Sequence, residues 1–192
     1  MIQKVIQNYL QGLKKVLKTA SPEKTKELMK SILSARRVFV FGAGRSGLIG
    51  KAFAMRLMHL GKEVFFIGET ITPAIQPGDV IFFISGSGDT LSVTNMLKAA
   101  QKKQIKILGL TARKNGTLYK KGDEIICLDT ENCLCSGDYL TMQILGSYRK
   151  VAPLGTSFES SALVYLDSLI VLLMAQLDKN EQDLKLRHAN IE

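Results

Sequence analysis

The residues best suited to chemistry form one short stretch, Ser85-Gly86-Ser87-Gly88-Asp89-Thr90. It follows an apolar run at residues 80–84 and precedes a helical pattern that starts near Leu91. A turn between a buried strand and a helix presents backbone N–H groups and the positive end of the helix dipole, which together suit an anion. The hydroxyls of Ser85, Ser87 and Thr90 add side-chain donors, so the stretch favours a phosphate monoester. The alternative is a structural turn in which Asp89 or Thr90 caps the helix.

A second glycine-rich turn follows an earlier apolar run at residues 37–41. Gly42, Gly44 and Gly47 match the G-x-G-x-x-G pattern of dinucleotide-binding turns, so a dinucleotide fold is a competing interpretation. That fold requires an acidic residue at the end of the second strand, whereas Glu69 comes only after Gly68. The turn is also not a nucleotide P-loop, because Ala52 stands where a magnesium-binding Ser or Thr is required.

The two turns are expected to face each other. In an open parallel sheet, the turns after the first and third strands meet at the carboxyl edge, where ligands bind. Arg45 and Ser46 would then lie across one small pocket from the hydroxyls of the 85–90 stretch. A positive charge at a helix N-terminus opposes the dipole, and a bound anion would offset that misfit.

Helical and apolar patterns on either side of the turns predict the elements that position them. Strands are expected at residues 37–41, 64–67, 80–84, 105–110 and 124–128, and helices at residues 2–17, 22–33, 91–103 and 160–177. A further helix is expected to follow the 42–47 turn and to end at residue 60. The strands are continuous apolar runs separated by helices, which is typical of a parallel sheet covered on both faces. We therefore expect an α/β fold, a three-layer αβα sandwich around a five-stranded parallel sheet with flavodoxin-like topology.

Length and composition predict one domain of 192 residues. We divide it into N-terminal helices (1–34), an α/β core (35–130) and a C-terminal helix with a tail (155–192). The apolar run 162–177 is too short and too polar for a bilayer span, so it is expected to be a core or interface helix. The net charge of +9 predicts a basic surface that favours anionic substrates, and no nucleic-acid-binding signature accompanies it.

The three cysteines, Cys127, Cys133 and Cys135, form no paired framework, which favours a reducing, cytoplasmic setting. With two histidines in the whole chain, no metal site is expected. His59, in a last helical turn, is expected to interact with the helix dipole. No targeting segment or membrane anchor is expected.

The two glycine turns, 42–47 and 85–90, resemble the phosphosugar-binding loops of sugar isomerase (SIS) domains. Four further stretches resemble the 6-phospho-3-hexuloisomerase family within that class: residues 51–61, 68–75, 155–159 and 187–192. The resemblance covers nearly the whole chain. It implies a homotetramer that interconverts 3-hexulose 6-phosphate and fructose 6-phosphate without a cofactor, in formaldehyde fixation by the ribulose monophosphate route.

The resemblance also assigns site residues. It implies substrate contacts from Gly44, Arg45 and Ser46 in the first turn and from Ser85, Gly86, Ser87, Gly88, Asp89 and Thr90 in the second. Asp89 stands where the family usually has Glu, and its shorter side chain also suits a cap. The segment 131–152 differs from the family and contains two of the cysteines.

Moving a carbonyl between neighbouring carbons requires a base and a second proton-transfer group. The resemblance implies that Glu159 is the base, although Thr156-x-x-Glu159 also fits a capping box at a helix start. A related class of arabinose-phosphate isomerases has a histidine at a similar remove from this helix. It implies that His188 acts as acid/base or ring-opening group, on a neighbouring subunit if the tail folds back; the alternative is an exposed or capping residue.

Three other functions compete with the isomerase. A non-catalytic sugar-phosphate sensor of the same fold would keep ligand binding in Glu159→Gln. A zinc-dependent heptose-phosphate isomerase would lose activity to a chelator. A dinucleotide-binding domain would bind NAD or NADP.

Overall fold

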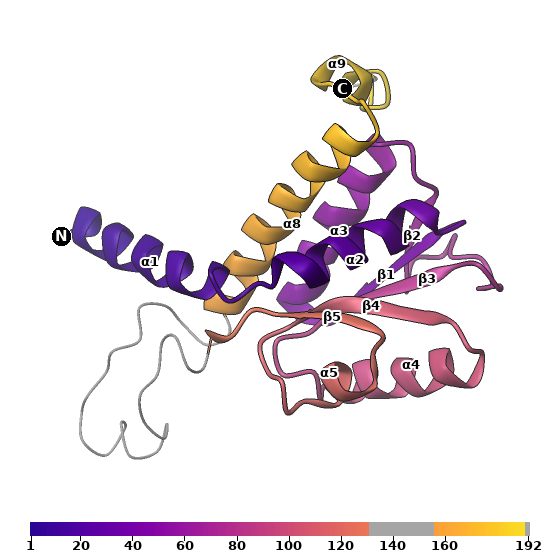
Figure 1. The fold of residues 1–192 in the computed structure, drawn as a ribbon, viewed down its shortest axis with the longest axis horizontal. Helices are drawn as coiled ribbons and strands as arrows, with labels where there is room; N and C mark the ends of the chain where they lie inside the picture. Colours follow the sequence, from indigo (N-terminus) through magenta and orange to yellow (C-terminus); the bar gives the residue numbers. More distant parts are fainter. Residues whose placement is uncertain (131–155, 191–192) are drawn as a thin grey trace.

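A parallel β-sheet forms the centre of the structure, a computed structural model that describes residues 1–130 and 156–190 (Figure 1). Within those residues the sheet has five strands in the order β2-β1-β3-β4-β5. The strands are β1 (Val38–Gly42), β2 (Val64–Phe66), β3 (Val80–Ile84), β4 (Lys106–Thr111) and β5 (Glu124–Cys127). This all-parallel order is the flavodoxin-like one, which confirms the predicted fold class.

Helices cover both faces of the sheet. One face is covered by α2 (Pro22–Ser34), α3 (Gly44–His59) and α8 (Thr156–Gln176), and the other by α4 (Leu91–Lys102) and α5 (Thr117–Lys121) (Figure 1). Side chains alternate between the faces: Val40 and Phe82 join the first layer, while Phe39 and Phe83 join the second. Two hydrophobic cores result, one on each side of the sheet.

Helix α8 is the core helix that its apolar sequence predicts. In the part of the chain that the structure describes, it is long and apolar enough to cross a membrane by length and composition, but half of that stretch is buried in the protein. Ala162, Leu166, Leu169 and Leu173 pack into the first core. The helix begins at Thr156, four residues before the predicted start at residue 160.

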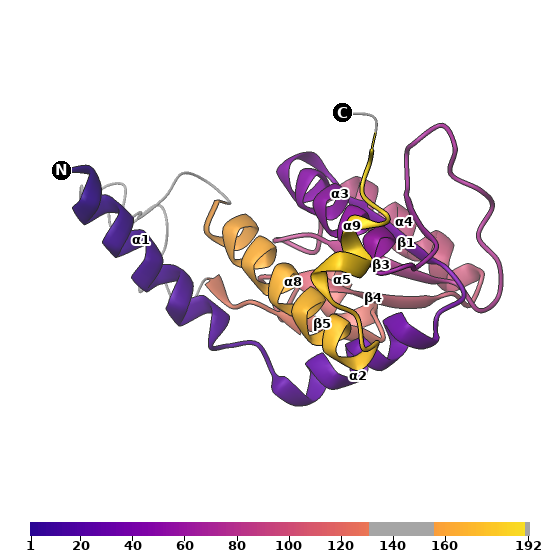
Figure 2. The ribbon, with the colours of Figure 1, turned by 90° about the horizontal axis from the view of Figure 1, so that it is seen from above.

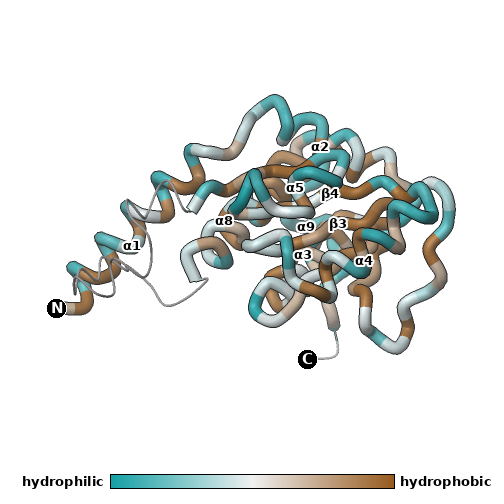
Figure 3. Tube along the Cα trace, turned by 90° about the horizontal axis from the view of Figure 1, so that it is seen from below, coloured by the Kyte–Doolittle hydropathy of each residue, from teal (hydrophilic) through white to brown (hydrophobic). Residues whose placement is uncertain are grey.

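Helix α1 (Ile2–Leu17) projects away from the rest of the chain (Figures 1 and 2). Its last turns are anchored, since Leu13 and Val16 are buried. Its first turns are not: the apolar residues Ile2, Val5, Ile6 and Leu10 are exposed. Apolar and polar residues alternate along this helix (Figure 3), and the exposed apolar ones form a stripe on it.

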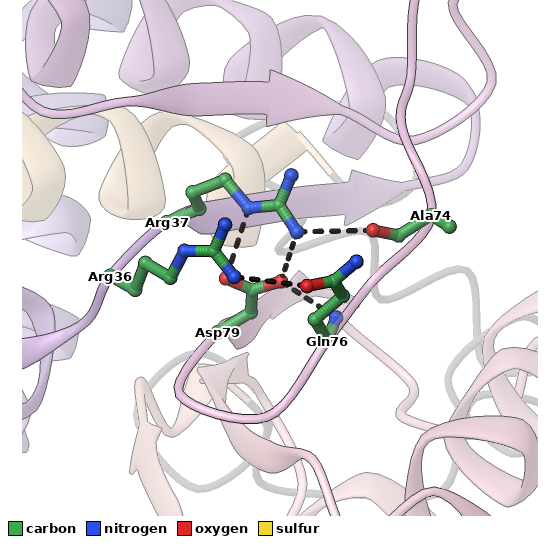
Figure 4. A network of polar contacts seen from close by, with 5 residues as sticks. All are labelled: Arg36, Arg37, Ala74, Gln76 and Asp79. Carbon is green, nitrogen blue, oxygen red and sulfur yellow. Dashed lines mark hydrogen bonds and ion pairs between the residues drawn. The ribbon is translucent and has the colours of Figure 1, made fainter.

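A buried ion pair ties the amino ends of two strands together (Figure 4). Arg37, just before β1, donates to both carboxylate oxygens of Asp79, just before β3, at 3.0 and 2.6 Å. Arg37 also donates to the Ala74 carbonyl at 3.0 Å, and Asp79 accepts from the Gln76 amide at 2.8 Å. The network holds the helix-free connection that leads into β3.

Two short helices were not predicted from the sequence. Helix α5 has five residues, which is too short for a periodic apolar pattern. Helix α9 (Glu181–Lys185) lies in the tail, and its capping box of Asn180 and Asp183 was the available signal. Apart from the start of α8, the predicted bounds of the other helices and strands agree with the structure to within one or two residues.

Candidate active site

The two glycine turns lie side by side at the carboxyl edge of the sheet. Strands β1 and β3 are neighbours, with Gly42 opposite Ile84, so the turns that follow them emerge next to each other. Helix α3 starts from the first turn and α4 from the second. This is the crevice in which open α/β sheets bind ligands.

Both helices start without a side-chain cap. The N-cap residues are Ala43 for α3 and Thr90 for α4, and neither makes a side-chain capping bond. The first N–H groups of both helices therefore remain without a capping side chain, as an anion site requires. Thr90 occupies the cap position that the structural alternative assigned to it, but its hydroxyl does not cap.

The serine hydroxyls shape the second turn from within. The buried Ser85 Oγ accepts from the Gly88 amide at 3.1 Å, and Ser87 Oγ accepts from the Asp89 amide at 3.2 Å. A hydroxyl that accepts one hydrogen bond still carries its own O–H. Both serines can thus hold the turn and donate to a bound anion at the same time.

Asp89 is directed to a different element. Its Oδ1 accepts from the Thr117 hydroxyl at 2.6 Å and from the Thr117 amide at 2.9 Å, at the start of α5. These bonds, first that of the Thr117 side chain and then that of its amide, lower the pKa of Asp89, and the charges of Arg113 and Lys120 add to the effect. The carboxylate is therefore ionised and already bonded within the protein.

The first turn of α8 contacts both glycine turns. A Cβ at Gly86 would lie 3.0 Å from the Phe158 ring, so this ring packs directly against the second turn. The next residue, Glu159, forms an ion pair with Arg45 at the start of α3. The Glu159 side chain is only 12% exposed, while that of Arg45 is 62% exposed. The structure thus brings a largely buried carboxylate to the edge of the anion crevice.

His188 lies elsewhere in the chain. Its ring packs against that of His59 at the end of α3, with centroids 5.2 Å apart and the ring planes tilted by 33°. Arg45 is in the first turn of the same helix, and fourteen residues at about 1.5 Å each separate the two ends by roughly 21 Å. The structure therefore does not bring Glu159 and His188 of one chain into one site. The Nδ1 atom of His188 donates to the Ala189 carbonyl at 3.2 Å, which leaves Nε2 as the ring nitrogen that can contact another group.

The prediction that His59 interacts with the helix dipole does not agree with its surroundings. It is buried, and burial lowers its pKa, with further contributions from His188 and Arg56. A ring in this position favours the uncharged form, which does not offset the negative end of a helix. The reason is tertiary packing of the tail on α3, which the periodicity of α3 does not reveal.

No metal site is evident in residues 1–130 and 156–190, where no three His, Cys, Asp or Glu side chains converge. Cys133 and Cys135 lie outside the described residues. A surface cavity of about 500 Å³ opens at the opposite edge of the sheet, lined by residues such as Gln104, Lys106 and Lys121. None of the predicted site residues lines it.

Comparison with known proteins identifies the family. The SIS-domain family model matches residues 31–139. An uncharacterized protein of Archaeoglobus fulgidus is 43% identical over 166 residues, 86% of each chain. A 3-hexulose-6-phosphate isomerase of Methanocaldococcus jannaschii is 36% identical over 168 residues, 88% of this chain and 84% of that one. The chain belongs to the SIS-domain family.

A solved structure supports a narrower class. A crystal structure of a hypothetical protein from Methanococcus jannaschii, said to infer a molecular function of 3-hexulose-6-phosphate isomerase, is 35% identical with a TM-score of 0.77. The two structures align over 100% of this chain and 98% of the Methanococcus jannaschii chain. The protein is an enzyme of the sugar-phosphate isomerase class, as its resemblance to 6-phospho-3-hexuloisomerases implies.

Proposed function

We propose that the protein converts D-arabino-3-hexulose 6-phosphate to fructose 6-phosphate through an enediol, in the ribulose monophosphate route of formaldehyde fixation. The observation that carries the proposal is the carboxylate of Glu159, held by Arg45 at the edge of the two glycine turns. Relatives named 3-hexulose-6-phosphate isomerase support the choice of substrate.

The phosphate group binds between the two turns. The uncapped starts of α3 and α4 supply backbone N–H groups, and Ser46, Ser85, Ser87 and Thr90 supply hydroxyls. Arg45 provides the positive charge on the same side. Anchoring the phosphate fixes the sugar chain, so that its reacting carbons reach one position beside the first turn of α8.

Glu159 moves the carbon-bound proton. It removes the proton from C2, the C2–H electron pair forms the C2=C3 double bond, and the C3 carbonyl oxygen gains a proton. The enediol then loses its O2 proton, the C2 carbonyl forms, and C3 receives the proton from Glu159. Arg45 pairs with the carboxylate and orients it for the first step.

The proton transfers between oxygens need a second group, which we assign to His188 of a neighbouring subunit. Within one chain His188 and Glu159 lie at opposite ends of α3, so only another copy can bring a His188 to this site. A homotetramer would supply it. Exposed apolar residues on α1 and α8, such as Ile6, Leu10, Val171 and Leu172, provide surface for such contacts. We assign the enzyme to the cytoplasm.

The reaction is tested by supplying 3-hexulose 6-phosphate, formed in place from ribulose 5-phosphate and formaldehyde by a separate synthase, and measuring fructose 6-phosphate through coupling enzymes. Turnover is expected in the wild type and in the presence of EDTA. Glu159→Gln removes the base but keeps the side-chain shape, so kcat should fall by about 10³-fold or more.

Ligand binding separates the remaining interpretations. Fructose 6-phosphate should bind Glu159→Gln nearly as well as the wild type in calorimetric titration. Binding without turnover in the wild type would contradict the proposal and favour a sugar-phosphate sensor, with Glu159 reduced to a helix cap. Loss of activity in EDTA would favour a metal-dependent isomerase instead.

A further inference from the structure

Residues 86–89 of the 85–90 turn are held by the segment 112–118, which is the connection between β4 and α5 with the first residues of α5. The Gly86 carbonyl accepts from the Ala112 amide at 2.9 Å, and the Gly88 carbonyl accepts from the Leu118 amide at 3.1 Å. Between them, a Cβ at Gly116 would lie 2.5 Å from the Ser87 carbonyl oxygen, so the two backbones touch there. Three successive carbonyls of the turn therefore face this connection.

This orientation determines where the amides of the turn point. In a planar trans peptide, the carbonyl and the following N–H point in opposite directions. Because the Gly86 carbonyl faces the connection, the Ser87 N–H faces the other way. The connection thus acts as a template that turns an amide donor of the 85–90 stretch outward, away from its own backbone.

Asp89 adds side-chain hydrogen bonds to this docking. Its Oδ1 accepts two bonds from Thr117, at 2.6 and 2.9 Å, from the residue that starts α5. An ionised carboxylate in contact with a phosphate repels it, and this repulsion weakens with distance. The two bonds of Asp89 to Thr117 therefore favour an Asp89 side chain that is held at α5 and does not contact the anion.

We propose that Asp89 is a positioning residue of the phosphate subsite, which fixes the 85–90 turn against the β4–α5 connection through Thr117 and does not itself contact the substrate. The inference rests on the proposed function in that it takes the turn as the phosphate site. It replaces the substrate contact that the resemblance implied for Asp89 by an indirect role.

The test measures phosphate affinity apart from catalysis. For wild type, Asp89→Ala, Thr117→Val and the double variant, we would measure kcat and KM, and the Kd of fructose 6-phosphate by calorimetric titration. Asp89→Ala should raise KM and Kd by about tenfold and change kcat less than about twofold, since the turn loosens while Glu159 stays in place. Thr117→Val loses the hydroxyl bond and keeps the amide bond, so its effect should be about threefold.

The double variant distinguishes positioning from contact. If Asp89 acts through Thr117, adding Thr117→Val to Asp89→Ala should change Kd no further. Additive effects of the two substitutions, or an Asp89→Ala variant with lowered kcat and unchanged Kd, would overturn the inference.

A matched control is available at the amino end of β4, the end opposite to the β4–α5 connection. Asp123 Oδ2 accepts from the Ile107 amide at 2.7 Å, the same kind of carboxylate-to-backbone bond. Asp123→Ala should lower the melting temperature as Asp89→Ala does, yet leave KM and Kd unchanged. A rise of Kd in Asp123→Ala as large as that in Asp89→Ala would mean that general destabilisation explains both, and would overturn the positioning role.

The outcomes also separate this inference from the proposed reaction. If the wild type binds fructose 6-phosphate without isomerising 3-hexulose 6-phosphate, the reaction is wrong, and the Kd series still decides the role of Asp89. If the wild type binds neither fructose 6-phosphate nor inorganic phosphate, the turn is not a phosphate subsite and the inference is overturned with it.

Discussion

At the residue scale, the pairing of Arg45 with Glu159 makes a specific prediction. Arg45 orients the proposed base and also faces the phosphate crevice, so its loss should affect both binding and chemistry. Arg45→Gln should lower kcat/KM by about 10²- to 10³-fold, since it removes a charge from the site. Arg45→Lys keeps the charge but not the planar guanidinium, and should recover part of the activity.

Steady-state kinetics on the two variants check this, with Lys51→Gln as a control from the same helix. Lys51 pairs with Glu69 at 2.6 Å, but both side chains are about half exposed, so the pair is worth little. The kcat/KM of Lys51→Gln should therefore stay within about threefold of the wild-type value. Equal activity of Arg45→Gln and Lys51→Gln would contradict a role for Arg45.

The sequence could identify these residues but not their partners. Glu159 follows from the family resemblance, and the glycine spacing locates Arg45, but the ion pair joins residues 114 positions apart. Asp89 is similar: its carboxylate could cap α4, and nothing local indicates that it bonds Thr117 instead. Such pairings depend on which loops the sheet order places next to each other.

At the element scale, the buried pair of Arg37 and Asp79 holds together two strand starts and the 74–79 connection (Figure 4). The Asp79 side chain is fully buried. Asp79→Asn leaves the Arg37 charge buried without its counter-ion, which should cost about 3–5 kcal/mol of unfolding free energy. Because the pair lies at the amino edge of the sheet, the KM of the folded variant should not change.

The same pair predicts the response to acid. Burial alone would raise the pKa of Asp79, but hydrogen bonds from Arg37 and the Gln76 amide, with the charge of Arg37, lower it overall. A carboxyl whose pKa is lowered by folding stabilises the protein at every pH above its pKa in the unfolded chain, which is about 4. This stabilisation is lost as the pH falls through the pKa of the folded state.

Urea unfolding of the wild type and Asp79→Asn at pH 7 and pH 3 measures the effect. The difference in unfolding free energy between the two proteins should be large at pH 7 and smaller at pH 3. A difference that does not depend on pH would show that the pair does not stabilise the fold through its charge.

Element type was predictable because the apolar runs are unambiguous, whereas element ends depend on contacts. The five strands and the parallel sheet follow from continuous apolar stretches separated by helices. The apolar pattern placed the start of α8 four residues late, because its first turn packs on the glycine turns: Phe158 contacts Gly86 and Glu159 pairs with Arg45. The capping-box spacing of Thr156 and Glu159 was the local signal for the earlier start.

At the scale of the whole molecule, the largest block of positive charge lies on other elements than the exposed apolar residues of α8. Residues 90–122 contain eight of the 26 Lys and Arg residues and no acidic residue, so they account for most of the net charge of +9. They include α4 and α5, on the face of the sheet opposite α3 and α8 (Figure 1). The exposed apolar residues of α8 therefore lie away from this block of charge, so copies of the chain can meet there. Those of α1 share their helix with Lys4, Lys14 and Lys15.

The projecting helix α1 tests whether copies meet there. Its exposed residues Ile6 and Leu10 form a stripe that one copy of the chain leaves in water. If the wild type is the proposed tetramer, Ile6→Glu with Leu10→Glu should reduce it to smaller species in light scattering coupled to size exclusion. Because these side chains are exposed in the single chain, the melting of the fold itself should change little.

Activity must follow the assembly if His188 reaches a neighbouring site. The α1 double variant should then lose kcat along with its tetramer, while Lys4→Glu, a charge change on an exposed lysine of the same helix, should keep both. Mixing inactive Glu159→Gln with inactive His188→Ala subunits should restore part of the activity, because mixed tetramers contain sites with both residues intact. Full activity in a monomeric variant, or no recovery on mixing, would mean that His188 does not act between subunits, and that the oxygen protons are moved by another group near Glu159.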